Sequence, residues 1–103
     1  ATALVGAYYA WLFALMDQLA EWTSEQGLSP EMARDLVVET MQGASGMAGT
    51  QKDASLKEIW ESLATPGGIS QHGIDIIRSG GGLDLWAQAL DSVTRILRKE
   101  GGA

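Results

Sequence analysis

Apolar residues recur along the chain at helical spacing, and no segment alternates apolar and polar residues for long enough to predict a strand. From Ala3 to Met16 every residue is apolar or glycine, which predicts a helix that is covered on most of its faces. The following turns are amphipathic, and their spaced acidic residues Asp17, Glu21 and Glu25 are interpreted as a solvated face. The pattern predicts five helices, over Thr2–Gln26, Pro30–Gly49, Ala54–Leu63, Ile69–Arg78 and Leu83–Lys99.

Glycine, proline and capping residues mark the ends of these helices. Gly27 is predicted to end the first helix, since glycine readily takes the left-handed conformation found at helix ends. Ser29 is predicted to cap the second helix, with Pro30 at its first position. Asp53 is predicted to cap the third. A sharp reversal between the third and fourth helices is expected at Thr65-Pro66-Gly67-Gly68.

Each helix except the fourth also has a set of residues expected to point inward. These are Leu15, Leu19 and Trp22, then Met32, Leu36, Val37 and Met41, then Leu56, Ile59, Trp60 and Leu63, and finally Leu83, Trp86, Leu90, Val93 and Leu97. Gly43, Gly46 and Gly49 lie near the end of the second helix, where each glycine costs about 1 kcal/mol relative to alanine. They indicate either the close approach of another backbone or fraying of the helix end.

The composition predicts one globular domain over residues 1–103 and excludes several functions. A net charge of −6 is the wrong sign for binding nucleic acid. Without cysteine, and with His72 as the only histidine, the chain has neither a thiol nucleophile nor a multi-histidine metal centre, and no metal site is expected.

The N-terminal region predicts neither a membrane span nor a signal peptide. The apolar run of 14 residues is shorter than the roughly 20 that a membrane-spanning helix needs. It also lacks the basic flank of a signal peptide, so no membrane partner and a cytoplasmic location are expected. The first residue is Ala1, not Met, which we interpret as processing or as a cut from a longer chain.

The segment Leu63–Ile77, LATPGGISQHGIDII, is where chemistry is expected. The backbone N–H groups of Gly68, Ile69 and Ser70 are predicted to point outward, unpaired, at the start of the fourth helix. Such a helix start can bind a carboxylate or phosphate, with the Ser70 hydroxyl beside it. A plain turn between two helices would carry the same residues.

TPGGIS followed by HGIDII resembles the SPGGTT segment of the pyrroline-5-carboxylate reductase family. The resemblance spans nearly the whole chain and is to that family's C-terminal dimerisation domain. Four further landmarks carry it in the same order: Ala3-Leu4-Val5-Gly6 with Ala10 and Trp11, Gly27-Leu28-Ser29-Pro30-Glu31, Gly43-Ala44, and Ile59 to Thr65.

The resemblance implies an all-α, five-helix bundle that forms an intertwined homodimer, like the C-terminal domain of 6-phosphogluconate dehydrogenase. It implies the dimerisation and substrate-pocket domain of an oxidoreductase that reduces a cyclic imine in proline biosynthesis with NADPH or NADH. The family's N-terminal Rossmann domain, which holds the cofactor, is absent from this chain. The implied substrate-binding residues are Thr65, Gly67, Gly68, Ile69 and Ser70, and the hydroxyl of Ser70 is the implied catalytic contact to the imine nitrogen.

A homodimer is also expected from the residues themselves. A helix that is apolar all round must be covered on all sides, and a domain of this size buries only about two-thirds of its surface. The large aromatic residues of the first helix would otherwise form an apolar patch beyond the roughly 300–600 Å² typical of monomers.

Three departures from the family pattern leave the substrate open. Thr65 replaces a serine, Ile69 replaces a small or hydroxylated residue, and Tyr8-Tyr9 replaces Gly-Pro. His72 lies either near the pocket or on a helix face with no role in it. Two other readings are a stand-alone, non-catalytic homodimerisation module and a reductase-like enzyme for a different small imine or acid.

Overall fold

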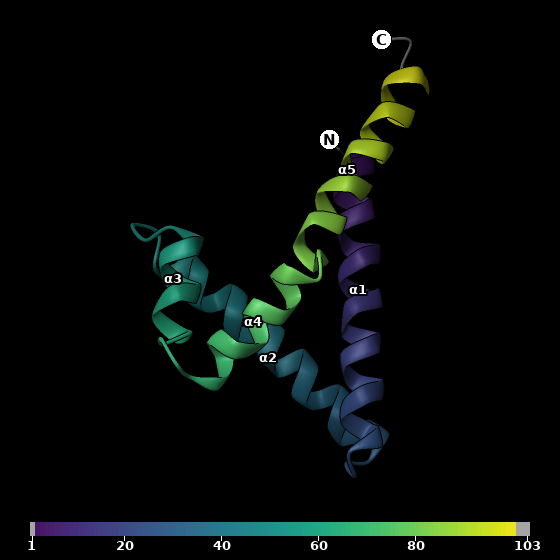
Figure 1. Cartoon of the computed structure of the whole chain (residues 1–103). Helices are drawn as coiled ribbons and strands as arrows, with labels where there is room; N and C mark the ends of the chain where they lie inside the picture. The colour runs from purple at the N-terminus through teal and green to yellow at the C-terminus, as the bar shows by residue number, and fades with distance from the viewer. Residues whose placement is uncertain (1, 101–103) are drawn as a thin grey trace. The chain divides into compact units, whose positions relative to one another are not determined.

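The computed structural model describes residues 2–100, and within this range the chain consists of helices joined by short turns, with no strand (Figure 1). The helices are α1 (Thr2–Glu25), α2 (Pro30–Thr50), α3 (Leu56–Leu63), α4 (Ile69–Ser79) and α5 (Gly82–Glu100). The predicted all-α fold class is therefore confirmed. All five predicted helices are present, with bounds within two residues of those expected.

The junction between α1 and α2 forms as the sequence predicts. Gly27 follows the end of α1 with φ +117°, a conformation that residues with a side chain rarely adopt. The Ser29 hydroxyl then accepts a hydrogen bond from the Met32 N–H (3.1 Å). Pro30 occupies the first position of α2. A backbone N–H at that position has no acceptor within the helix, so proline loses no hydrogen bond there.

The predicted cap of α3 is wrong. Ser55, not Asp53, precedes the helix, which begins at Leu56. The Ser55 hydroxyl accepts a hydrogen bond from the Glu58 N–H (3.0 Å), and the Glu58 carboxylate accepts one from the Ser55 N–H (2.9 Å). This reciprocal capping box satisfies two backbone N–H groups, whereas a single capping aspartate satisfies one. The backbone N–H and hydroxyl of Ser55 hold the pKa of Glu58 below its ordinary 4.5.

Contacts within the chain divide it into two compact units, one holding α1 and α2 and the other holding α3, α4 and α5. In the first unit α1 packs along α2, and in the second α4 packs against α5. Only three residues in the described part of the chain are both hydrophobic and buried, namely Ala33, Val37 and Ala64. Each unit therefore has a very small core of its own.

Many residues predicted to point inward are exposed in the single chain. They are Leu19, Trp22, Met32, Leu36, Leu56, Leu63, Leu83 and Trp86. Others on the same stripes, including Leu15, Met41, Ile59 and Leu90, are half-buried. The helical periodicity was interpreted correctly, but packing within each unit leaves much of the apolar stripes uncovered.

The three glycines near the end of α2 all lie within the helix, which continues past Gly49 to Thr50. A Cβ placed on Gly43, Gly46 or Gly49 would meet nothing within 4 Å. Within the unit of α1 and α2, no other segment packs closely against these three positions.

Candidate functional site

The reversal between α3 and α4 is a tight β-turn over Thr65–Gly68. Pro66 takes its second position, and Gly67 takes the third with φ +80°. The N–H of Gly68 donates a hydrogen bond to the Thr65 carbonyl oxygen (2.9 Å). Proline followed by a glycine with positive φ is the signature of a type II turn. The TPGG sequence therefore fixes the local backbone path.

Gly68 is confined by the turn that it closes. A Cβ at this position would lie 2.8 Å from the Thr65 Oγ1 and 3.1 Å from the Thr65 carbonyl oxygen. The predicted role of the Gly68 N–H is wrong, because that group is engaged by the turn and does not point outward unpaired. The TPGG sequence is sufficient to predict this bond, because the N–H of the fourth residue of a type II turn commonly donates to the carbonyl oxygen of the first.

The next two N–H groups, of Ile69 and Ser70, have no hydrogen-bond acceptor within residues 2–100. Gly68 precedes α4 as its N-cap and offers no side chain to them. The Ile69 side chain is 92% exposed, and Ser70 is exposed beside it. The start of α4 thus presents two N–H donors and one hydroxyl at the surface, where an anion is favoured by the helix dipole.

His72 is an exposed residue of α4, two positions after Ser70. Its backbone N–H donates to the Gly68 carbonyl oxygen (3.1 Å) as part of the first helical turn. Residues two apart on a helix are about 200° apart around its axis, so His72 does not share the face of Ser70. This placement favours the reading in which the histidine lies on a helix face.

The two helices that flank the turn are joined by a pair that sequence reasoning missed. The Arg78 guanidinium of α4 lies over the Trp60 ring of α3, 5.6 Å from its centroid. The backbone carbonyl oxygen of Trp60 accepts a hydrogen bond from the Ala64 N–H at the end of α3 (3.0 Å). Ala64 is buried directly before the turn. The turn is therefore held from both sides. The sequence offered no signal for the pair, because 18 positions separate the two residues.

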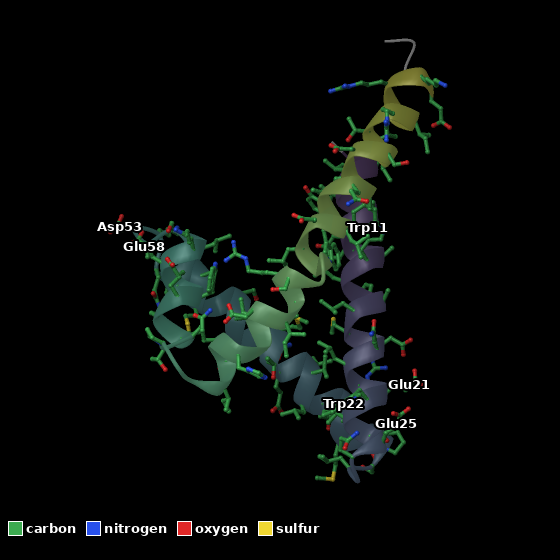
Figure 2. All side chains as sticks on the ribbon, viewed as in Figure 1. Trp11, Glu21, Trp22, Glu25, Asp53 and Glu58 are labelled. Carbon is green, nitrogen blue, oxygen red and sulfur yellow. The ribbon has the colours of Figure 1, made fainter. Side chains whose placement is uncertain are left out.

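A groove of about 650 Å³ runs between α1 and α2. Phe13, Met16 and Val37 contribute apolar lining. The acidic residues Asp17, Glu21 and Glu25 of α1 also line it, together with Arg34 of α2. Figure 2 shows Glu21 and Glu25 on the same side of α1, as their spacing of four residues requires. These acids were interpreted as a plain solvated face, and only the packing of α1 along α2 reveals the groove.

The helix from Ala3 to Glu25 is long and apolar enough, by length and composition alone, to cross a membrane. The fourteen-residue apolar run considered above is thus part of a longer candidate segment. This segment carries Asp17, Glu21 and Glu25 in its second half. A charged side chain at the centre of a membrane costs about 2.5–3.5 kcal/mol. The core helix of a soluble protein and a signal sequence near the N-terminus pass the same test.

Each unit thus combines exposed apolar stripes with a very small core. The chain belongs to the pyrroline-5-carboxylate reductase dimerisation family, because the sequence model of that family matches residues 1–99. A pyrroline-5-carboxylate reductase from Acremonium sp. is 28% identical over 97 residues, which is 94% of this chain. The chain spans about 30% of that relative's length. No solved structure matches it.

Proposed function

We propose that this chain is the dimerisation and substrate-pocket part of a reductase that acts on a cyclic imine carboxylate, in proline biosynthesis in the cytoplasm. The family match over residues 1–99 carries the proposal. The reductase from Acremonium sp. supports it, because its similarity extends over 94% of this chain. Since the chain corresponds to about 30% of that relative, the activity is assigned to the intact protein and not to these residues alone.

The first proposed role is pairing with a second copy. The described residues bury few apolar side chains, and large ones such as Tyr9, Phe13 and Trp22 are each 62% exposed. Obligate homodimers commonly bury more than about 2,000 Å² in total, and this chain exposes 8185 Å². Folding and association are then coupled, so the melting temperature rises with protein concentration. A folded species of 10.9 kDa in sedimentation equilibrium at micromolar concentration would contradict this role.

The second proposed role is holding the substrate carboxylate at the start of α4. The N–H groups of Ile69 and Ser70 donate to the carboxylate, and the Ser70 hydroxyl donates to the imine nitrogen. Thr65, Gly67 and Gly68 shape the turn that places these donors. A hydrogen bond to the imine nitrogen withdraws electron density from the C=N bond, which favours hydride attack at carbon.

The nicotinamide cofactor does not fit this chain. A dinucleotide-binding fold needs a strand that leads into a glycine-rich turn and a helix. Residues 2–100 contain no strand, and the sequence has no G-x-G-x-x-G. The proposal therefore assigns the binding of NADPH or NADH to another part of the intact protein. The purified 103-residue chain is expected to show no turnover with either cofactor.

Substitution of Ser70 tests the substrate role. In the intact protein, Ser70→Ala should lower turnover of pyrroline-5-carboxylate about 100-fold, the usual effect of removing one donor that stabilises developing charge. Ser62→Ala is the matched control, because its hydroxyl bonds to the Ile59 carbonyl oxygen within α3 (2.7 Å). Equal turnover by the two variants would contradict the role assigned to Ser70.

Two alternatives rest on specific observations. The exposed apolar residues of the helices would equally suit a stand-alone helical dimerisation module without catalysis. The exposed Ile69 at the turn, in place of a small or hydroxylated residue, favours a reductase-like enzyme for another small imine or acid. The coding sequence upstream of Ala1 separates the first alternative from our proposal. Turnover compared across several cyclic imines separates the second.

A further inference from the structure

The groups assigned to the substrate site lie on both sides of the TPGG turn. Thr65 follows α3, and its Oγ1 lies 2.8 Å from the position that a Cβ on Gly68 would occupy, beside the start of α4. The N–H groups of Ile69 and Ser70 belong to α4. The first N–H groups of a helix point along its axis. The direction of α4 relative to α3 therefore decides where these donors lie relative to the Thr65 hydroxyl.

The turn and the packing of α3 do little to fix this direction. The turn is closed by one hydrogen bond, from the Gly68 N–H to the Thr65 carbonyl oxygen (2.9 Å). Helix α3 has eight residues, and none of them is buried. Its Leu56 and Leu63 side chains are 72% and 61% exposed. A short helix with so little burial needs a further contact to be held at one angle to α4.

The Arg78–Trp60 pair supplies such a contact at a distance from the turn. Arg78 lies in the last turn of α4, and its guanidinium is 5.6 Å from the centroid of the half-buried Trp60 ring. Arg78 is eight positions beyond Ser70, which is about 12 Å along the helix axis. Trp60 lies one helical turn before Ala64, whose N–H donates to the Trp60 carbonyl oxygen (3.0 Å). The pair and the turn thus join α3 and α4 at two separate points.

We propose that Trp60 and Arg78 form a positioning pair, which holds α4 so that the Ile69 and Ser70 donors face the substrate carboxylate. This inference rests on the proposed function of the site. Arg78 does not attract the carboxylate itself, because its distance from Ser70 exceeds the roughly 8 Å over which exposed charges are screened at physiological salt. A cation over an exposed aromatic ring changes an equilibrium constant about two- to fivefold, which sets the size of the expected effect.

Steady-state kinetics of the intact protein, with pyrroline-5-carboxylate as substrate, test the pair. Arg78→Gln and Trp60→Leu should each raise the KM for this substrate about two- to fivefold. The double variant should raise it no further, because either change removes the same contact. Arg78→Lys keeps a cation and should recover part of the loss.

The KM for the nicotinamide cofactor distinguishes positioning from a loss of folded protein. This KM should stay unchanged in every variant, since cofactor binding is assigned to another part of the intact protein. Partial unfolding would lower kcat and leave both KM values as they were. That result would overturn the positioning role.

Lys57→Gln is the matched control. It also removes one positive charge, from an exposed side chain of α3 that pairs with Glu61 (3.9 Å). This control should leave the KM for pyrroline-5-carboxylate unchanged, because exposed ion pairs contribute little. An equal rise in Lys57→Gln and Arg78→Gln would mean that only net charge matters. A rise in Arg78→Gln without one in Trp60→Leu would mean that Arg78 attracts the substrate directly. Either result would overturn the proposal.

A measurement without substrate separates this inference from the proposed function. In the isotope-labelled chain, the nuclear magnetic resonance signals of the Ile69 and Ser70 amides should shift in Arg78→Gln and return toward their original positions in Arg78→Lys. Lys57→Gln should leave them in place. Such shifts in a protein that does not turn over pyrroline-5-carboxylate would mean that the proposed function fails while the pair still positions the donors. Unshifted signals in Arg78→Gln would overturn the positioning role itself.

Discussion

The two turns that follow α1 and α3 use the same residue types but leave different backbone groups exposed. Each contains a proline and a glycine with positive φ, Gly27 in the first and Gly67 in the second. In the first turn Ser29 supplies a hydroxyl that accepts an N–H at the start of α2 (3.1 Å). In the second turn Gly68 supplies no side chain to the start of α4. A capped helix start is complete by itself, whereas an uncapped one keeps donors available for a ligand.

Alanine at the positive-φ glycines should break both turns and have the largest effect. Gly27→Ala and Gly67→Ala should each destabilise the fold by about 1–3 kcal/mol, because a Cβ is strained in this region. Gly27→Ala should lower the free energy of unfolding more than Gly67→Ala, because φ +117° lies further from the left-handed helical region than φ +80°. Urea denaturation at one fixed protein concentration measures the difference. Equal stability of the Gly27 variant and the unchanged chain would contradict the assigned turn geometry.

Removing the two serine hydroxyls sharpens the comparison between the helix starts. Ser29→Ala should cost about 1 kcal/mol, because a bonded N-cap is lost. Ser70→Ala should change stability by less than about 0.5 kcal/mol, because its hydroxyl makes no hydrogen bond within residues 2–100. Thermal unfolding of both variants at matched concentration checks the ratio. A larger loss at Ser70 than at Ser29 would show that the hydroxyl has a structural role.

The Arg78–Trp60 pair offers a test of how firmly the second turn is held. Arg78→Gln should cost about 0.5–1 kcal/mol, the usual value of a cation over an aromatic ring at an exposed site. Arg78→Lys keeps the charge and should recover part of that loss. The fluorescence of Trp60 would be followed in a chain whose other three tryptophans are replaced by phenylalanine. Identical stability of the Gln variant and its parent would rule out a stabilising contact.

The smallest expected effect concerns the start of α3, where a third capping arrangement occurs. Because the folded-state pKa of Glu58 is lowered, its contribution to stability is present above pH 4.5 and is lost as pH falls through the folded-state pKa. Glu58→Gln keeps an acceptor for the Ser55 N–H but removes the charge. The stability gap between the two chains should therefore shrink as pH falls below about 4.5. A gap that is constant from pH 7 to pH 3 would contradict this account.

Local sequence signals predicted the parts of the fold that depend on few residues. Gly27, Ser29 and Pro30 predicted the first turn correctly, since each acts through its own backbone or side chain. Asp53 was predicted to cap α3, whereas the cap is the reciprocal pair Ser55 and Glu58, whose S-x-x-E pattern is visible in the sequence.

Features that depend on packing could not be predicted in the same way. The groove requires α1 to pack along α2, and its Arg34 carries no signal of its own. The exposure of Trp22 and Leu56 depends on packing beyond their own helices, which helical periodicity does not encode.

The three glycines of α2 have an evolutionary consequence. The Cβ of an alanine at position 46 would meet nothing within 4 Å in the single chain. Gly46→Ala would stabilise the helix by about 1 kcal/mol. Selection for the stability of one chain would therefore replace this glycine, whereas selection for any surface that approaches α2 to backbone distance would retain it. Sequence drift at Gly43, Gly46 and Gly49 would thus distinguish lineages in which this face has lost its neighbour from those in which it is still in use.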